Sequence, residues 1–270
     1  MASKLKTFDD VAFNNEEQAN VLVGEGEDIE KLKMLKQVSQ KFLDINDFDI
    51  SDEPNFEDMS SDQFIDYMET KNKNNLVINK LDELNIDITF RSSMSNYYKH
   101  KTLENNNIFI FFLPEDNRSS NSVSFTDFKK FITLVFKLDC REGLLISKKD
   151  LSPISLKQVR QCNISPGSCD NIYNIISYKD DDFVDLTKHA FVPEVIKVYR
   201  SGEETDKFGN ENKINNNKLP RQLMDDPLTK FYRGKVGDIF KLRRKNISKF
   251  NILDEQLIYR VVIPAVFKKS

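Results

Sequence analysis

The stretch 219–262 constrains the fold of this chain most, because residues that begin or break regular structure alternate there with apolar segments. Pro220 disfavours the α conformation of the residue before it, so Leu219 is predicted to be extended. Asp226 followed by Pro227 is typical of a helix start, with aspartate at the N-cap and proline at the first helical position. Gly234 then keeps this helix short.

Two segments after the short helix have the apolar–polar alternation of half-buried strands. The first, 237–242, opens with the turn residue Gly237, and the second covers 257–263. We expect the two strands to pair as a hairpin closed by 245–255. The C-terminal region is therefore predicted to be a small α/β domain.

This order of motifs resembles the assembly domain of the RNA polymerase subunit five family, which includes the shared eukaryotic subunit and its archaeal counterpart. An upstream block, 184–193, also resembles a segment of that family. The resemblance implies that its matching residues face a partner or set the domain fold. These residues are His189, Pro193, Leu219, Pro220, Arg221, Asp226, Pro227, Tyr232, Gly237, Lys241, Arg244, Tyr259 and Arg260.

The chain departs from the family pattern between these two blocks. The family has an acidic, leucine-bearing helix there, whereas 202–217 is rich in asparagine and has almost no apolar side chain to bury. We therefore expect a mobile loop at 202–217. Val195 occupies a position where the family usually has a histidine. These changes are typical of a divergent member of the family, and both a cellular and a viral origin remain open.

The N-terminal part alternates helical and strand patterns. Apolar residues recur every three or four positions from Ile29 to Phe42, which predicts an amphipathic helix. The run 108–113 is wholly apolar and too short for a helix, which favours a buried strand, and Ser124 is the predicted cap of the following helix. Further helices are predicted at 61–71, 76–84 and 153–161, and further strands at 86–90, 143–147, 172–176 and 183–186.

Strand, helix, strand succession implies a parallel or mixed sheet with helices on its face. The pattern also resembles the jaw domain of the same family, whose fold is similar to that of restriction-type nucleases. The fold class is therefore α/β, with an N-terminal mixed-sheet jaw domain of restriction-nuclease-like topology and a small C-terminal α/β assembly domain. We predict a polar tail at 1–27, the jaw domain at 28–180 and the assembly domain at 181–270.

The bulk composition fits one large or two ordinary domains, since 39% of the 270 residues are apolar and 31% are charged. The net charge of −3 hides local asymmetry. Residues 44–69 hold ten acidic side chains and no Lys or Arg, whereas 218–249 hold ten basic and three acidic ones. The basic cluster favours phosphate or an acidic partner, and a solvated strand edge guarded by basic residues is an equal alternative.

The three cysteines, Cys140, Cys162 and Cys169, have no CxxC spacing, so we expect neither disulfides nor a zinc site. The start of the chain lacks the apolar core of a signal peptide, and no window is apolar enough to span a membrane. We expect an intracellular protein: nuclear if it is cellular, and in a cytoplasmic factory or virion if it is viral.

A nuclease site requires an acid followed by a D/E-x-K motif on adjoining strands. The best candidate is Asp127-Phe128-Lys129, preceded by Asp116. Asp127, however, falls in the first turn of a predicted helix, where an acid simply favours the helix dipole. His189 is alone, and no residue is placed to activate a nucleophile. We expect no catalytic residue, metal or cofactor.

These patterns, with the resemblance, predict a non-catalytic subunit of a multisubunit DNA-dependent RNA polymerase. The resemblance implies that the C-terminal domain anchors the chain on the largest subunit, among other polymerase subunits. It also implies that the jaw lies beside downstream DNA, with no membrane and no small-molecule substrate. Two alternatives remain: a stand-alone DNA-binding regulatory protein and a metal-dependent nuclease.

Overall fold

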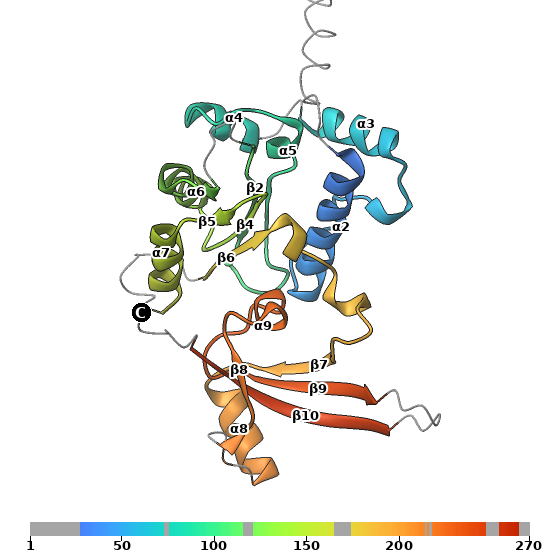
Figure 1. The fold of residues 1–270 in the computed structure, drawn as a ribbon, viewed down its shortest axis with the longest axis vertical. Helices are drawn as coiled ribbons and strands as arrows, with labels where there is room; N and C mark the ends of the chain where they lie inside the picture. Colours follow the sequence, from blue (N-terminus) through green and yellow to red (C-terminus); the bar gives the residue numbers. More distant parts are fainter. Residues whose placement is uncertain are drawn as a thin grey trace, which may run out of the picture. The chain divides into compact units, whose positions relative to one another are not determined.

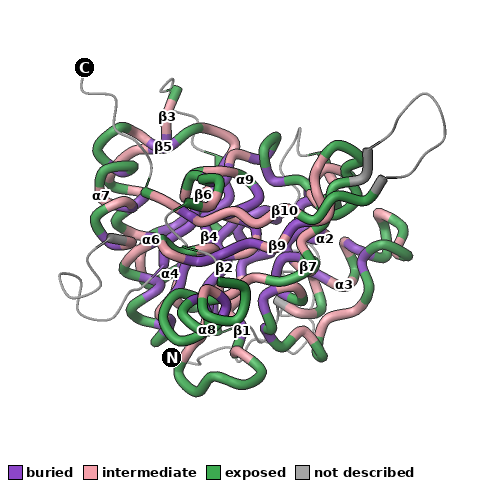
Figure 2. Tube along the Cα trace, turned by 90° about the horizontal axis from the view of Figure 1, so that it is seen from below, coloured by how far each residue is buried: buried purple, intermediate pink, exposed green. Residues whose placement is uncertain are grey.

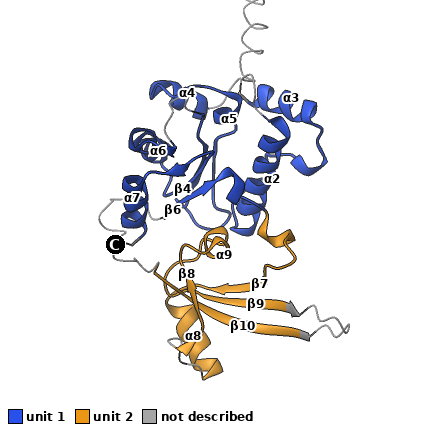
Figure 3. Ribbon diagram, in the orientation of Figure 1, with its two compact units in different colours: residues 1–184 blue, residues 185–270 orange. Residues whose placement is uncertain are grey.

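A computed structural model divides the chain into two compact units, residues 1–184 and 185–270 (Figure 3). The predicted tail, 1–27, lies outside the residues that the structure describes. The described residues are 28–72, 76–115, 121–164, 174–213, 215, 218–246 and 254–264.

The first unit is built on a four-stranded sheet with the order β1-β2-β4-β6. Strands β2 (Ile108–Phe112), β4 (Glu142–Ser147) and β6 (Asn174–Lys179) run parallel, and β1 (Asn96–Tyr98) pairs antiparallel with β2. Every residue of β2 and β4 is buried, as expected of a parallel sheet covered on both faces. Figure 2 colours the chain by burial, with buried residues in purple. The predicted mixed α/β class is confirmed.

Helices lie on both sides of this sheet (Figure 1). Helices α6 (Phe125–Lys137) and α7 (Pro153–Ile164) follow β2 and β4 along the chain and cover one face, while α2 (Ile29–Ile45) lies on the other side. Stacked rings of β2 and α6 fill the core of the first face; Phe111 and Phe131 lie 6.0 Å apart between ring centroids. Gly143 leaves room for this contact, because a Cβ there would come within 2.6 Å of Phe131 Cζ. The remaining elements of this unit are η1 (Phe56–Asp58), α3 (Ser61–Asn72), α4 (Leu76–Glu83), α5 (Phe90–Ser93), β3 (Ser122–Val123), β5 (Asp150–Leu151) and η2 (Asp180–Asp182).

A buried ion pair holds the carboxyl ends of the parallel strands. The guanidinium group of Arg91 donates to both carboxylate oxygens of Asp180, at 2.8 and 2.6 Å. It also donates to the carbonyl oxygens of Leu113, just after β2, and Ile146 of β4. The Arg91 side chain is fully buried and that of Asp180 is 2% exposed. The pair thus fastens α5, β2, β4 and the segment after β6 together.

Two strands predicted in this region were wrong. Residues 86–89 form no strand, because Thr89 and Ser92 make a capping box that begins α5. Residues 183–185 are irregular and Leu186 begins a 3-10 turn; the centroid of the buried Phe183 ring lies 5.0 Å from that of the Tyr178 ring. The strand predicted at 172–176 begins at Asn174 in the structure, and its first two residues lie outside the described part.

The second unit is a four-stranded mixed sheet with the order β7-β9-β10-β8. The predicted hairpin is confirmed: β9 (Ile239–Asn246) and β10 (Asp254–Ile263) pair antiparallel up to Asn246 opposite Asp254. Strand β7 (Glu194–Tyr199) lies antiparallel to β9, and β8 (Arg221–Leu223) lies parallel to β10. Helix α9 (Pro227–Phe231) has the predicted cap, since Asp226 Oδ1 accepts from the N–H of Leu228 at 2.9 Å. A 3-10 turn, η3 (Leu186–Lys188), precedes β7.

The two faces of this sheet differ in what covers them. Residues that are paired in register share a face. On the Leu242 face, Phe240, Leu242 and Val262 pack with Leu228 and, half-buried, Tyr232. The opposite face, which we call the Tyr259 face, carries Tyr199 and Tyr259.

The mobile loop predicted at 202–217 is wrong, because residues Glu203–Asn212 form helix α8. The ring of Phe208 lies 4.8 Å from that of Tyr199 and 5.0 Å from that of Tyr259, and it is 2% exposed. Three acidic residues in the first turn favour the helix dipole. One aromatic side chain, in contact with two tyrosines of the Tyr259 face, thus orders a helix that the composition disfavours. Residues 214, 216 and 217 of the predicted loop lie outside the described part.

We expect Phe208→Ala to release α8 from the Tyr259 face. The helix has little other apolar surface to bury, so the amide protons of Glu203–Asn212 should exchange roughly 10-fold faster or more, as expected when a buried aromatic contact is lost. Hydrogen exchange resolved by residue measures this. Lys207→Ala is the matched control, because the neighbouring Lys207 side chain is 76% exposed. Equal exchange in both variants would contradict the role of Phe208.

Candidate functional site

A pocket of about 460 Å³ in the second unit gathers residues from both sequence blocks that resemble the polymerase family. The segment 186–195 contributes His189 and Pro193, and α9 with the turn after it contributes Leu228 and Tyr232. The rest of the lining is Leu186, Thr187, Lys188, Ala190, Val192, Glu194, Val195 and Arg243. Residues more than thirty positions apart in the sequence therefore meet at one site.

The pocket has an apolar floor and a polar rim. Leu186, Val192 and Val195 pack with the buried core of the Leu242 face. Tyr232 lies between the apolar floor and the polar rim. Its burial raises the pKa of its hydroxyl, and the negative charges of Asp185 and Glu194 raise this pKa further. That hydroxyl thus stays protonated and is available for hydrogen bonding at neutral pH.

An exposed aromatic side chain stands beside the pocket. Phe191 is 86% exposed, and its ring centroid lies 6.0 Å from that of His189. His189 itself is exposed and ends the turn η3, whose cap is the Asp185 carboxylate. Leaving so large an apolar ring in water is unfavourable, which is typical of a residue that is covered by a partner.

Four residues of the family resemblance set the backbone rather than a surface. Asp226 and Pro227 begin α9 as predicted. The carbonyl oxygen of Pro220 accepts from the N–H of Val261 at 2.9 Å and thereby starts the β8–β10 pairing. Gly237 has φ +94°, a conformation that favours glycine, and its N–H donates to the carbonyl oxygen of Val262 at 3.0 Å.

The three arginines of the resemblance do not converge. Arg221 is paired with Val261 and so lies on the Tyr259 face. Arg244, opposite Gln256, and Arg260, opposite Phe240, lie on the Leu242 face. Among the described residues, none of the three arginines makes a side-chain hydrogen bond or ion pair. In the described part, none of the three therefore pairs with Asp225 or Asp226.

The remaining residues of the resemblance lie near these elements. Lys241 Nζ lies 5.9 Å from the centroid of the Tyr259 ring, so both belong to the face that α8 covers. Leu219 is half-buried just before β8. Leu219 does not line the pocket.

Sequence reasoning missed a buried hub at Asp238, which it placed inside a strand. The structure starts β9 only at Ile239, because the Asp238 carboxylate accepts from the N–H groups of Ser201 (2.7 Å) and Lys235 (2.9 Å). Arg200 also donates to it at 3.1 Å. In the sequence, the clue to this role was an acidic residue directly after the turn at Gly237, at an otherwise apolar position. Asp238 ties the chain after β7 to the turn before β9.

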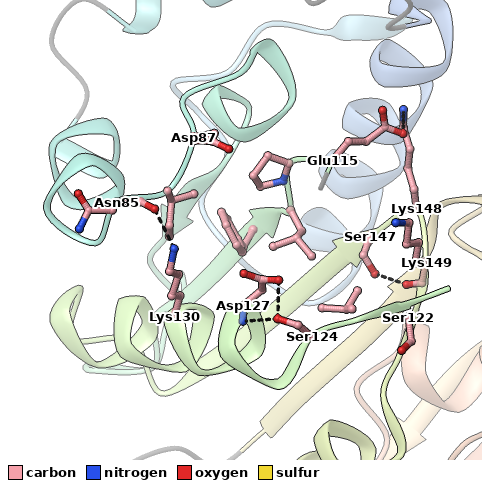
Figure 4. A pocket seen from close by; sticks show the side chains of 15 residues that line it. Asn85, Asp87, Glu115, Ser122, Ser124, Asp127, Lys130, Ser147, Lys148 and Lys149 are labelled. Carbon is pink, nitrogen blue, oxygen red and sulfur yellow. Dashed lines mark hydrogen bonds and ion pairs between the residues drawn. The ribbon is translucent and has the colours of Figure 1, made fainter. Parts of the chain in front are cut away.

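A second pocket, of about 260 Å³, opens at the carboxyl ends of β2 and β4 in the first unit (Figure 4). Asp127 lines it, but its carboxylate accepts from Ser124 Oγ at 2.6 Å and its N–H donates back to that oxygen, a helix cap as predicted. Lys130 donates to the carbonyl oxygen of Asn85 at 2.8 Å. The charged side chains of Asp127 and Lys130 therefore bind other groups of the fold.

The D-x-K motif considered for a nuclease is not assembled there. Lys129 Nζ lies 4.8 Å from the centroid of the Phe125 ring and does not line the pocket, and the motif is on a helix rather than a strand. Asp116 lies outside the described residues. Within the described ranges, no group of three His, Cys, Asp or Glu side chains is arranged to hold a metal ion. No helix of the described part is long and apolar enough to cross a membrane.

The second unit coincides with a known domain. Residues 184–262 match the model of the RNA polymerase Rpb5 C-terminal domain, which spans β7 to β10 and both blocks that line the pocket. Comparison with curated protein sequences gives no match. Over residues 184–262 the chain is therefore similar to the C-terminal domain of RNA polymerase Rpb5.

Proposed function

We propose that the protein is a non-catalytic subunit of a multisubunit DNA-dependent RNA polymerase. The observation that carries this proposal is the Rpb5 C-terminal domain at 184–262, in which both motif blocks meet at one pocket. Subunits of this kind act through binding. The second unit presents an apolar pocket, an exposed Phe191, and Arg244 and Arg260, which make no ion pair with described residues; these are features of a protein-binding surface.

In this proposal the C-terminal domain anchors the chain on the largest polymerase subunit. Support comes from Arg244 and Arg260, which lie on the Leu242 face with no ion pair in the described part. Guanidinium groups bind carboxylates bidentately, so such arginines suit an acidic partner surface.

The first unit is proposed to be the jaw domain beside downstream DNA, with the restriction-nuclease-like topology that the resemblance implies. The order of its elements supports this assignment: a long helix, a buried strand, a helix, a second buried strand, and a helix beginning at Pro153. The parallel order β2-β4-β6 with α6 and α7 on one face also fits.

Co-purification tests the proposal. A tagged full-length chain, isolated from cells in which it is naturally produced, should bring down the two largest subunits of a polymerase in stoichiometric amounts. Mass spectrometry of the eluate identifies them. A chain that is isolated alone and binds DNA with a steep dependence on salt would instead be a stand-alone DNA-binding protein.

A further inference from the structure

The pocket of the second unit has the chemistry of a site for one apolar side chain. Its volume of about 460 Å³ is in the range of pockets that enclose a small ligand or a large side chain. Leu186, Val192, Val195 and Leu228 supply apolar walls. Tyr232, half-buried with its hydroxyl protonated, adds one polar group that orients an incoming chain.

Charged groups of both signs surround this apolar site. Lys188, Arg243 and Glu194 line the pocket, and the charge of Asp185 also acts on Tyr232. Arg243 lies 3.6 Å from Glu194 and 3.8 Å from Glu255, long contacts between partly exposed groups that contribute little. Two positions beyond Leu242 on the same face, Arg244 is exposed and makes no ion pair with described residues.

An apolar pocket near an exposed arginine that makes no ion pair with described residues favours a segment that is both apolar and acidic. Phosphates of a nucleic acid would satisfy the arginines but would leave the apolar walls and Phe191 exposed to water. Resting on the proposed function, we propose that the pocket binds an acidic segment of another RNA polymerase subunit. This segment inserts one large apolar side chain against Val195 and Leu228, packs on Phe191, and pairs a carboxylate with Arg244.

Site-specific cross-linking in the assembled polymerase tests the chemistry of the occupant. Phe191→p-benzoylphenylalanine keeps a large aromatic group at a position that is 86% exposed, so folding should be unchanged. Irradiation should link it to a polymerase subunit, within a segment that carries an apolar residue flanked by Asp or Glu. Linkage to DNA, to a segment without acids, or to nothing would overturn the proposal.

Reversing the charge of Arg244 tests whether it pairs with an acidic partner, and the same change at Arg221 is the matched control. Arg244→Glu should lower the fraction of the chain that stays on immobilised polymerase in a salt wash by about tenfold or more. Arg221→Glu makes the same charge change in the same unit, but on the Tyr259 face, and should change retention less than about threefold. Equal loss in both variants would indicate a general charge effect and overturn the assignment of the Leu242 face.

These experiments distinguish a failure of the pocket assignment from a failure of the proposed function. If the unmodified chain fails to co-purify with a polymerase, the proposed function itself is wrong. If it co-purifies while Arg244→Glu and Phe191→Ala are both retained like the parent, the function stands and the pocket assignment is wrong. Thermal unfolding of each variant shows whether the second unit is intact, and we expect no shift, since both side chains are exposed.

Discussion

Asp180→Ala is expected to destabilise the first unit by about 3–5 kcal/mol. The change leaves the guanidinium group of Arg91 fully buried without a counter-ion, and an arginine cannot escape by losing its proton. The Arg91 contacts to the carbonyl oxygens of Leu113 and Ile146 do not replace the lost charge. The carboxyl ends of β2 and β4 should therefore open first.

Thiol labelling measures this opening within the first unit. Cys140 and Cys162 are buried there, and burial, with the nearby charge of Asp139, raises the pKa of the Cys140 thiol to about 12. Both thiols should react only after the unit opens. In a Cys169→Ser background, labelling of Asp180→Ala should be roughly 100-fold faster or more, because each 1.4 kcal/mol is a factor of ten.

The neighbouring acid supplies the control. Asp181 pairs with Lys31 at 2.8 Å, a distance like those of the Arg91–Asp180 pair, but both side chains are partly exposed. Asp181→Ala should be labelled at nearly the rate of the parent, because water replaces an exposed ion pair. Replacing both partners, as in Arg91→Met with Asp180→Leu, should recover most of the loss. Equal rates for Asp180→Ala and Asp181→Ala would show that burial of the pair contributes nothing.

The spacing of apolar residues along the chain predicted most of the helices and strands, because this spacing shows which face of a helix or strand is buried. The apolar run 108–113 became β2 with every residue buried, and the spacing from Ile29 to Phe42 became α2. Caps were equally informative at Ser124 and Asp226, where one side-chain oxygen satisfies free backbone N–H groups. These signals need no knowledge of distant residues.

Elements held by a single distant contact were not predictable. Helix α8 has a polar sequence, and its order comes from Phe208 between two tyrosines of the sheet. The Arg91–Asp180 pair joins residues 89 positions apart, and neither belongs to a charge motif. Local propensity has no information about such contacts.

The sequence predicted several residues of the candidate site, but it did not predict how the fold arranges them. The resemblance included His189, Pro193 and Tyr232, which the fold brings to one pocket. It also grouped Arg221 with Arg244, although the parallel pairing of β8 places Arg221 on the other face of the sheet. The sequence contained no sign of that pairing, and it did not reveal the exposure of Phe191.

Glu53→Gln is expected to remove a large part of the acid sensitivity of the first unit. Glu53 belongs to the acidic stretch 44–69, yet its side chain is 3% exposed and meets two lysines from flanking helices. Its Oε1 lies 2.9 Å from Lys36 Nζ of α2 and 2.8 Å from Lys71 Nζ of α3, and it accepts from the Tyr98 hydroxyl at 2.6 Å. One carboxylate oxygen thus joins both helices to β1.

The pKa values fix the direction of the pH effect. Burial by itself raises the pKa of Glu53, but the charges of Lys36 and Lys71 outweigh it and lower that pKa to about 2, below the ordinary 4.5. The ionised carboxylate therefore stabilises the folded unit above about pH 4.5, and this contribution is lost as the pH falls towards 2. The difference corresponds to about 3 kcal/mol.

Above pH 4.5, Glu53→Gln should unfold more easily than the parent, because Lys36 is then buried beside a neutral amide. Burial already lowers the pKa of Lys36 to about 8 despite the opposing charge of Glu53, so without that carboxylate the pKa should fall further. The free energies of unfolding of parent and variant, measured by urea denaturation from pH 7 to 2, should converge by about 3 kcal/mol below pH 4.5. Glu57→Gln removes an exposed carboxylate four residues away and should track the parent throughout. A constant gap between Glu53→Gln and the parent at every pH would show that Glu53 acts by packing alone and that its charge does not hold α2, α3 and β1 together.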